Sequence, residues 1–307
     1  MIENKVYSEA DINFNVGELL HRVEPSKILM CTPTYFEVLD IKNIYMQKQL
    51  GSVNAADALH QWANLNTIYE QLKNQQYLEE VLVIDGEKGC EDMVFAANQS
   101  FPWLNEVGEK VVVMSKMYHD SRAKEVPFFE KFYSDLGYRI EHLQHTDFFE
   151  GMGDTIPHPC LRLLYGGYGH RSSMEAYTEL SQLLHVPIIA LELIDERFYH
   201  LDTCFLPVSK DTVMICAEAF TEEGLNAIKK LFNKVILIPI EEASQFFALN
   251  AHIIQSSDTH EAVAIIQAGA EKTASLLSSI GVRVIFTDTS EYMKSGGSVF
   301  CMKMMIY

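Results

Sequence analysis

The sequence has little positive charge for its length of 307 residues. It contains 24 Lys and Arg residues against 42 Asp and Glu residues, which gives a formal net charge of −18 at pH 7. This balance argues against nucleic acids and anionic membranes as partners, because both attract positively charged proteins. It is compatible with an enzyme that binds a cationic small molecule, although an acidic excess most often belongs to a solvated surface.

Cysteines are few and widely scattered, and no two of them form a CxxC pair. They are Cys31, Cys90, Cys160, Cys204, Cys216 and Cys301. This spacing argues against a zinc site and against a disulfide framework, so we predict no metal and no cofactor. A reducing cytoplasm is the simplest setting for such a chain.

Long hydrophobic runs are also absent. No apolar stretch approaches the roughly 20 residues of a membrane helix, and the longest candidate, VPIIALELI, is interrupted by Glu192. The first residues, MIENKVYSEADINF, lack the basic and apolar regions of a secretory signal. Apolar residues nevertheless make up 48% of the chain, enough for a sizeable core in one large or two ordinary domains.

From Ser26 onward, one order of elements repeats five times. An apolar strand is followed by an amphipathic helix, a second apolar strand, and a short strand that carries a polar residue. Helices are predicted from about Asn54 to Leu72 and after Lys124, Ser172, Thr221 and Gly269. Ser172 and Glu175 have the spacing of a capping box. The predicted short strands are MVFAAN, FFEGMGD, FYHLDTCF, FFALNAHII and SVFCMKM.

One polar residue in each short strand recurs at a nearly constant period. These residues are Asn98, Glu150, His200, Asn250 and Cys301, with separations of 52, 50, 50 and 51. Such a period indicates repeated supersecondary units that share one core. Five units can close into a ring, in which the five polar groups would point toward a common axis. We therefore predict an N-terminal arm over residues 1–25 and a single domain over residues 26–307.

Three of the five polar residues suit nucleophilic catalysis on a planar carbon. A Cys301 thiolate attacks electron-poor carbon, a His200 imidazole transfers protons near neutral pH, and Glu150 can hold a cation or orient the imidazole. If the target is a guanidinium group, Asp202 is a further candidate to hold it, because it is predicted to share a strand face with His200. Asp154 is another candidate for substrate binding, and the two glycines before it allow close backbone approach.

Each of these residues also has a purely structural interpretation. Buried cysteines usually pack as small hydrophobic groups, and a histidine in an apolar segment is often a hydrogen-bonded core residue. Asn250 is interpreted as structural, because a buried amide can satisfy neighbouring backbone groups.

The segments FEGMGD, RFYHLDTCF and SGGSVFCM resemble the three signature regions of the guanidine-modifying superfamily. Its members include arginine deiminases, dimethylarginine dimethylaminohydrolases and amidinotransferases. The resemblance runs from about Pro33 to Cys301, and TPTYFEV, IKNIYM, MVFAANQ and YGGYGHRS place it in the arginine dihydrolase-like branch. It implies an α/β fold, the five-bladed β/α-propeller often called the pentein fold, with pseudo-fivefold repeats of about 50 residues.

The resemblance also implies a role for individual residues. Cys301 matches the nucleophile, His200 the general acid and base, and Glu150 the carboxylate that grips the guanidinium group. The remaining matches are substrate contacts: Asp202 as a second acidic contact, Arg122 and Arg171 for the α-carboxylate, and Asn43 and Asn98 at other substrate-facing positions. Arginine deiminases typically have an aspartate where Asn98 stands. An amide can also donate a hydrogen bond, so it could hold the neutral urea group of citrulline.

The predicted function is hydrolysis of the guanidino group of arginine or a close relative through a covalent thiouronium on Cys301. An arginine dihydrolase would give ornithine, ammonia and carbon dioxide. The alternatives are dimethylarginine hydrolysis, amidino transfer, and a catalytically silent propeller that binds arginine-like ligands or a protein. The sequence leaves open whether the chain forms a homo-oligomer.

Overall fold

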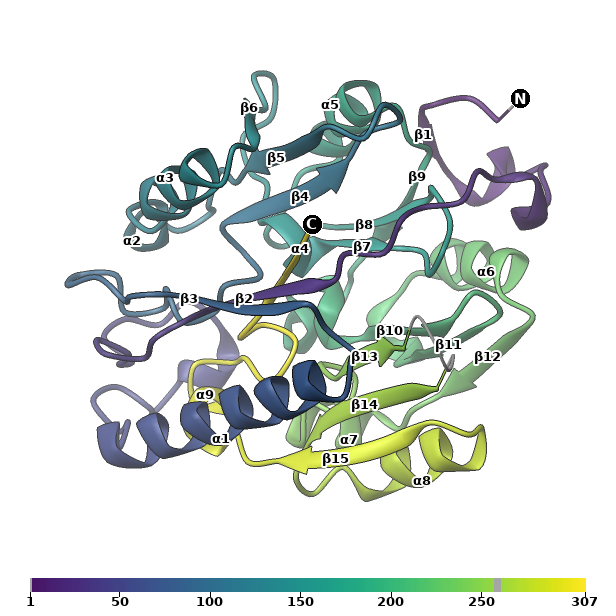
Figure 1. The fold of residues 1–307 in the computed structure, drawn as a ribbon. Helices are drawn as coiled ribbons and strands as arrows, with labels where there is room; N and C mark the ends of the chain where they lie inside the picture. The colour runs from purple at the N-terminus through teal and green to yellow at the C-terminus, as the bar shows by residue number, and fades with distance from the viewer. Residues whose placement is uncertain (1, 257–260) are drawn as a thin grey trace. The chain divides into compact units, whose positions relative to one another are not determined.

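The computed structural model describes residues 2–256 and 261–307 (Figure 1). The chain divides into two compact units. Unit 1 comprises Met1–Glu24, Asn98–Ile238 and Tyr307, and unit 2 comprises Pro25–Ala97 and Pro239–Ile306. The segment predicted as an arm belongs to unit 1, where β1 (Val6–Tyr7) pairs in parallel with β9 (Ile188–Glu192). A single domain over residues 26–307 stays a prediction.

Unit 1 contains three sheets built on one plan within its described residues. In each sheet the first strand is antiparallel to the second, and the second is parallel to the third. The strands are β4 (Ser100–Leu104), β5 (Lys110–Met114) and β6 (Arg139–His142); β7 (Thr155–Pro157), β8 (Leu164–Tyr168) and β9; and β10 (Phe205–Ser209), β11 (Thr212–Ile215) and β12 (Lys234–Leu237). The middle strands β5, β8 and β11 are largely buried, as predicted for central apolar strands.

The described part of unit 2 contains two sheets with the same plan. Their strands are β13 (His252–Gln255), β14 (Ala262–Gln267) and β15 (Arg283–Thr287), and β16 (Met304–Ile306), β2 (Lys27–Cys31) and β3 (Glu80–Ile84). The last strand of the chain therefore pairs with the first strand of the unit, and Met304 lies opposite Leu29. Cys301 packs in the core of this unit with Phe95 and Tyr292.

A helix connects the second and third strand of every sheet, because a parallel pair of strands needs a crossover. These helices are α3 (Val126–Asp135), α5 (Met174–Leu184) and α6 (Glu222–Leu231) in unit 1, and α1 (Ala55–Asn74) and α8 (Glu271–Ser279) in unit 2. All five were predicted from the sequence and are confirmed. The side chain of Asn54 accepts hydrogen bonds at the start of α1, and Thr221 does so at the start of α6.

Shorter helices lie in the connections. They are α2 (Asp120–Ala123), α4 (Gly151–Asp154), α7 (Ile240–Gln245) and α9 (Ser290–Met293), with the 3-10 helices η1 (Glu9–Asp11), η2 (Val16–Glu18), η3 (Ile44–Met46), η4 (Glu196–Phe198), η5 (Leu201–Thr203) and η6 (Ala217–Ala219). Within residues 2–256 and 261–307, no helix combines the length and apolar character that a membrane crossing requires.

The prediction that each periodic polar residue lies in a short strand is wrong. All five residues lie in turns or beside short helices, a few positions before the first strand of a sheet. Backbone N–H groups there bond to carbonyl groups three residues earlier, as in Phe95 to Asp92 and Cys204 to Leu201. These turns are buried, so their composition is as apolar as that of a strand. The fold remains mixed α/β, as predicted.

Candidate active site

The centre of the candidate site in unit 1 is a buried pair, Glu150 and His200. Nε2 of His200 lies 2.6 Å from Oε2 of Glu150, and the two side chains are 1% and 0% exposed. Because an ionised carboxylate only accepts hydrogen bonds, Nε2 must carry the proton that it donates. Nδ1 of His200 is buried and has no hydrogen-bond partner in the part of the chain that the structure describes. A neutral His200 therefore presents a basic nitrogen suited to proton transfer.

Glu150 is held by further contacts within unit 1. Its Oε1 accepts a hydrogen bond from the backbone N–H of Tyr118 at 3.0 Å and lies 3.5 Å from Nη1 of Arg171. The Arg171 guanidinium lies over the ring of Tyr199, 4.9 Å from its centroid. Glu150 and Arg171 thus hold each other in a buried, aromatic-lined environment.

Charge and burial set the ionisation of the pair. Burial raises the pKa of Glu150, but Arg171, the hydrogen bond from His200 and the charge of Arg122 outweigh it, so that its pKa lies well below the usual range. Burial lowers the pKa of His200 to about 4, although Glu150 opposes the shift, and the two arginines lower it further. At neutral pH, the site therefore contains an ionised carboxylate and a neutral imidazole.

Arg122 and Asn98 form a second contact group beside His200. Arg122 donates to both carboxylate oxygens of Glu125, at 3.2 and 3.0 Å, and to Oδ1 of Asn98 at 3.0 Å. A Cβ atom on Gly153 would lie 2.2 Å from Nδ2 of Asn98 and 3.4 Å from the ring of His200. Gly153 therefore allows the Asn98 amide and the His200 imidazole to approach the same backbone position.

Asp154 connects the segments that carry Glu150 and His200. One of its carboxylate oxygens accepts a hydrogen bond from the Ser172 hydroxyl at 2.7 Å, and the other accepts from the N–H of Leu201 at 3.1 Å. The Ser172 oxygen in turn accepts from the N–H of Glu150 at 3.0 Å. The predicted capping box at Ser172 is wrong, because Ser173 precedes α5 and the Ser172 hydroxyl is engaged with Asp154.

Asp202 is buried within η5, two residues after His200. Burial is the main cause that raises the pKa of Asp154 well above its usual value, and the negative charges of Glu150 and Asp202 raise it further. Unit 1 thus gathers three buried carboxyl groups around the segment of His200, and Glu150, whose pKa is lowered, is the one held ionised and suited to binding a cation.

In unit 2, the Asn250 side chain holds the loop that carries Cys301. Its Nδ2 donates to Sγ of Cys301 at 3.2 Å, and its Oδ1 accepts from the N–H groups of Ser298 at 3.1 Å and of Cys301 at 3.3 Å. The N–H of Ala97 donates to the Cys301 carbonyl at 3.1 Å. Cys301 is 2% exposed, as a small core residue would be, but its sulfur also has a polar neighbour.

Steric constraints explain why Gly296 and Gly297 precede Cys301. Gly296 has φ = +88°, a conformation that favours glycine, and a Cβ atom on Gly297 would lie 2.3 Å from the ring of Phe95. Asn43 holds the start of this loop, because its Nδ2 donates to the carbonyl of Ser295 at 2.9 Å while its Oδ1 caps η3. Its predicted contact with substrate stays a prediction.

The predicted site residues thus fall into two groups. Unit 1 brings together Glu150, His200, Asn98, Arg122, Arg171, Asp154 and Asp202. Unit 2 brings together Cys301 and Asn250, and Asn43 binds the same loop. Sequence reasoning missed Glu125 and Ser172 as supporting residues, although YGHRSS already contained Ser172. The close backbone approach predicted for the glycines of EGMGD is confirmed at Gly153.

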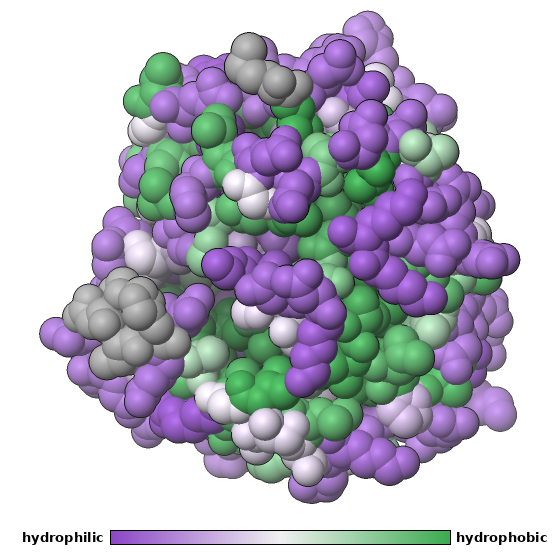
Figure 2. Space-filling model, turned by 90° about the vertical axis from the view of Figure 1, so that its right-hand side faces the viewer, coloured by the Kyte–Doolittle hydropathy of each residue, from purple (hydrophilic) through white to green (hydrophobic). Residues whose placement is uncertain are grey.

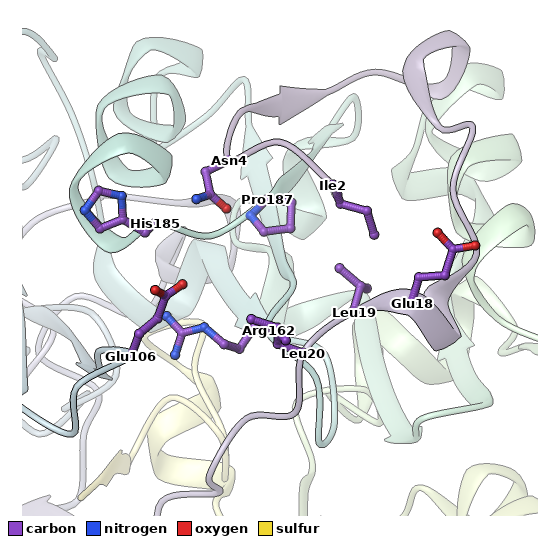
Figure 3. Close-up of a pocket in the computed structure, with 9 residues that line it drawn as sticks. All are labelled: Ile2, Asn4, Glu18, Leu19, Leu20, Glu106, Arg162, His185 and Pro187. Carbon is purple, nitrogen blue, oxygen red and sulfur yellow. The ribbon is translucent and has the colours of Figure 1, made fainter.

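Two hollows in unit 1 contain none of these residues. One has a volume of about 220 Å³, and Figure 3 shows its lining, with the Glu106 carboxylate beside the Arg162 guanidinium. The other, of about 300 Å³, is lined in part by Tyr168, Glu192 and Glu223. Among the described residues, no group of three or more His, Cys, Asp or Glu side chains is arranged to hold a metal ion.

Hydrophobic side chains are exposed between hydrophilic ones on the face that Figure 2 draws. In unit 1, the large exposed hydrophobic residues include Leu20, Val23, Ile194 and Leu237. Apolar atoms contribute much of the surface of any folded protein, so these residues do not by themselves define a binding surface.

Comparisons with known proteins agree with the motifs. Residues 32–307 match the family described as N,N dimethylarginine dimethylhydrolase, eukaryotic. The chain is 30% identical over 281 residues, 91% of its length, to the bifunctional arginine dihydrolase/ornithine cyclodeaminase AgrE of Nostoc sp.. It is also 30% identical over 278 residues to the N(G),N(G)-dimethylarginine dimethylaminohydrolase of Mycobacterium tuberculosis, which covers 91% of this chain and 85% of that protein.

A solved structure shares the fold. The N-terminal domain of the cyanobacterial arginine dihydrolase ArgZ, a mutant bound to its substrate, aligns with a TM-score of 0.81 and 29% identity, over 91% of this chain and 97% of that chain. The present chain spans only 38% and 37% of the length of the two bifunctional relatives AgrE and ArgZ. It belongs to the dimethylarginine dimethylaminohydrolase family, in the arginine dihydrolase-like branch of the guanidine-modifying superfamily of enzymes.

Proposed function

We propose that this chain is a cysteine-dependent arginine dihydrolase, which converts arginine and two water molecules into ornithine, two ammonia molecules and carbon dioxide. The observation that carries the proposal is the buried pair of an ionised Glu150 and a neutral His200 at 2.6 Å. This pair combines an anion for a guanidinium group with a base for proton transfer. The similarity to two arginine dihydrolases supports the choice of substrate.

The first step forms a covalent intermediate. His200 takes the proton of the Cys301 thiol, and the thiolate attacks the guanidinium carbon, so that a C–S bond forms. One C–N bond then breaks, and the nitrogen leaves as ammonia with the proton that His200 returns. A cationic thiouronium remains on Cys301, and Glu150 and Asp202 stabilise its charge.

The second step hydrolyses the thiouronium and gives citrulline, whose side chain ends in a urea group. A water molecule gives one proton to His200 and its oxygen to the thiouronium carbon. The C–S bond breaks, the sulfur leaves as the thiol with the proton of the new hydroxyl group, and citrulline forms. His200 then passes its extra proton to ammonia, which balances the charge of the reaction.

A second round on bound citrulline gives the remaining products. Cys301 displaces the second ammonia to form a thiocarbamate, water releases a carbamate, and the carbamate breaks down to ornithine and carbon dioxide. The Asn98 amide can donate as well as accept, so it suits the neutral urea of citrulline better than a carboxylate does. Arg122 and Arg171 are proposed to bind the α-carboxylate of the substrate.

The mechanism requires that both units serve one substrate. We propose that residues 26–307 act as a single catalytic domain, a five-bladed β/α-propeller. Two observations on the described residues support this proposal. Five three-stranded arrangements share one strand order, and each periodic polar residue lies just before the first strand of one of them.

A reducing compartment, the cytoplasm, is the proposed setting. All six cysteines are free thiols in the structure. A thiol nucleophile is also protected from oxidation in such a compartment.

The experiment is incubation of the purified chain with arginine, citrulline and dimethylarginine, with ammonia, ornithine and dimethylamine as readouts. The proposal expects ornithine and two equivalents of ammonia from arginine, and no turnover by Cys301→Ala. Cys160→Ala, which removes a half-buried thiol outside both groups of site residues, is the matched control and should retain activity.

Other outcomes identify the alternatives. Dimethylamine from dimethylarginine would favour the activity for which the matching family is named. Arginine turnover that requires an amine acceptor would indicate amidino transfer, and ligand binding without any product would indicate a catalytically silent protein. Arginine turnover by Cys301→Ala at the wild-type rate would overturn the mechanism.

A further inference from the structure

We infer that Asn250 is a positioning residue for the nucleophile: its amide nitrogen holds the Cys301 sulfur, and its amide oxygen fixes the loop that carries it. The inference deepens the proposed function and rests on Cys301 being the nucleophile. It assigns a role in the reaction to a residue that the family motifs do not name.

A single side chain makes three contacts with the nucleophile loop. Its Nδ2 lies 3.2 Å from Sγ of Cys301, and its Oδ1 accepts from the N–H groups of Ser298 and Cys301. The Asn250 carbonyl adds a fourth contact, because it accepts from the N–H of Phe300 at 2.9 Å. Asn250 is 0% exposed and its own N–H donates to Phe247, so its backbone is fixed just before β13.

The two N–H donors determine which way the amide points. Ser298 and Cys301 both present backbone N–H groups, which only the oxygen of Asn250 can accept. The nitrogen must therefore face the sulfur, and the orientation follows from the hydrogen-bond network. An N–H donor at the sulfur stabilises the thiolate more than the thiol, because hydrogen bonds to a charged acceptor are stronger.

The loop does not depend on Asn250 alone. The Ser298 hydroxyl lies 2.7 Å from the hydroxyl of Thr289, and the Ser295 hydroxyl donates to Asp92 at 2.8 Å. These contacts stay when Asn250 is replaced, so a variant can lose the contact with the sulfur and keep the loop.

Nearby charges in unit 2 are the same in every variant. The Lys303 ammonium lies 3.3 Å from the ring centroid of Phe300, and His252 packs against the same ring. Burial lowers the pKa of His252 well below its usual value, and Lys303 lowers it further. A change in the reactivity of Cys301 in Asn250→Ala, which adds no charge, therefore reports the loss of the amide.

The test compares Asn250→Asp with Asn250→Ala. The aspartate keeps the acceptor oxygen for Ser298 and Cys301 but loses the N–H toward the sulfur, and its negative charge opposes a thiolate. The rate of Cys301 alkylation by iodoacetamide is followed against pH by peptide mass analysis, together with kcat and KM. Asn64→Asp, on the exposed face of α1, is the matched control.

We expect Asn250→Asp to move the midpoint of the Cys301 alkylation profile to higher pH. We also expect kcat to fall by about 10- to 100-fold and KM by no more than about threefold in either direction, as for loss of a charge-assisted hydrogen bond. Asn250→Ala should shift the profile less than the aspartate. A purely structural role would leave the profile of Asn250→Ala unchanged, because alanine removes the N–H without adding a charge, and that result overturns the inference.

A measurement without a variant at Asn250 covers the case in which both variants fail to fold. The side-chain amide protons of Asn250 should change their NMR frequencies when Cys301→Ala removes the sulfur, and unchanged frequencies contradict the contact. The two proposals also fail separately. If the wild-type protein shows no turnover but the variants show the alkylation shift, only the proposed function is contradicted. If the wild-type protein turns over arginine and Asn250→Ala has an unchanged alkylation profile, only the positioning role is contradicted.

Discussion

The two units prepare chemically active groups in opposite ways. In unit 1, the groups are charged: Glu150 is ionised and paired with Arg171, while Arg122 is paired with Glu125. In unit 2, the Cys301 sulfur is held by the neutral amide of Asn250. Glu150, His200 and Cys301 nevertheless occupy the same place in the plan of their sheets, the turn before a first strand.

This difference shows what each kind of group needs from its surroundings. A buried charge is costly unless a partner and hydrogen bonds compensate it, so unit 1 surrounds Glu150 with Arg171, His200 and the N–H of Tyr118. A thiol can be buried without such compensation. We therefore expect changes in the charged group to reduce both stability and activity, and changes around the sulfur to reduce mainly activity.

The largest effect is expected for Glu150→Gln, which removes the charge and keeps the shape. Arg171 then lacks its buried partner, so the free energy of unfolding should fall by about 3 kcal/mol, as when one member of a buried ion pair is removed. Activity should fall on the order of 10³-fold, because the guanidinium group loses its anion. Denaturant unfolding and arginine turnover measure the two effects.

The exposed Glu175→Gln, on α5 of the same unit, is the control for Glu150→Gln and should change neither quantity. A Glu150→Gln protein with wild-type turnover would contradict the role of the carboxylate.

A smaller effect is expected for added methyl groups at the two site glycines, one in each unit. In Gly297→Ala, the new Cβ meets the buried Phe95 ring, so stability should fall by about 1–3 kcal/mol. In Gly153→Ala, the new Cβ meets the end of the Asn98 side chain, which can move away. We therefore expect Gly153→Ala to lose less stability than Gly297→Ala and to raise KM for arginine. Equal loss of stability in both, with KM unchanged, would show that Gly153 serves packing alone.

Ser172→Ala should have a still smaller effect. It removes the hydrogen bonds of one hydroxyl to Asp154 and to the N–H of Glu150, at a cost of about 1–2 kcal/mol. Because these bonds orient Glu150, kcat should fall by about tenfold. Ser173→Ala, which loses only longer contacts of 3.3 Å to Phe148, is the control. Equal kinetics in the two variants would exclude a positioning role for Ser172.

The last prediction concerns the dependence of stability on pH. In the unfolded chain, His200 takes up a proton below about pH 6.5, whereas burial keeps it neutral in the folded unit down to about pH 4. The unfolded state thus binds more protons in this window, so the free energy of unfolding falls as the pH decreases from about 6.5 to about 4.

Burial also lowers the pKa of His158 to about 4, so His158 contributes to the same loss of stability at low pH. Comparing His200→Gln with the wild type isolates the contribution of His200, because His158 is present in both proteins. Unfolding by denaturant at several pH values should show a weaker decline with acidification in His200→Gln than in the wild type. An equal decline would mean that His200 is not held neutral by its site.

Local patterns in the sequence predicted the elements that depend on local information. The five main helices and the two apolar strands beside each of them were predicted because apolar residues recur there at helical or strand spacing. The turn MVFAAN was mistaken for a strand because a buried turn is just as apolar, and only its hydrogen bonds distinguish the two. The period still placed Glu150, His200 and Cys301 at equivalent positions before a first strand, since it depends on residue spacing and not on the type of element. Their role as site residues stays a prediction.

Contacts between distant segments could not be read from the sequence. Ser172 has the spacing of a helix cap, but its hydroxyl donates a hydrogen bond to Asp154, 18 residues earlier. Asn250 was correctly predicted to satisfy neighbouring backbone groups, whereas its contact with the sulfur of Cys301 spans 51 residues. The hydrogen-bond partner of a polar side chain depends on which groups folding brings together, and a local sequence motif does not contain that information.

The central claim is that the charged group of unit 1 and the sulfur of unit 2 act on the same guanidinium carbon. It is tested most directly by labelling Cys301 with two reagents, a chloroacetamidine, which carries a cationic amidine, and neutral iodoacetamide. The ratio of the two rates cancels any general change in access to the sulfur. Both rates are compared in wild-type and Glu150→Gln protein by peptide mass analysis.

If Glu150 binds the cation that Cys301 attacks, Glu150→Gln lowers the ratio of amidine to iodoacetamide labelling at least about tenfold, and arginine protects the wild-type sulfur from both reagents. A ratio that is the same in wild-type and Glu150→Gln protein would contradict the claim, because the carboxylate and the sulfur would then not share a ligand.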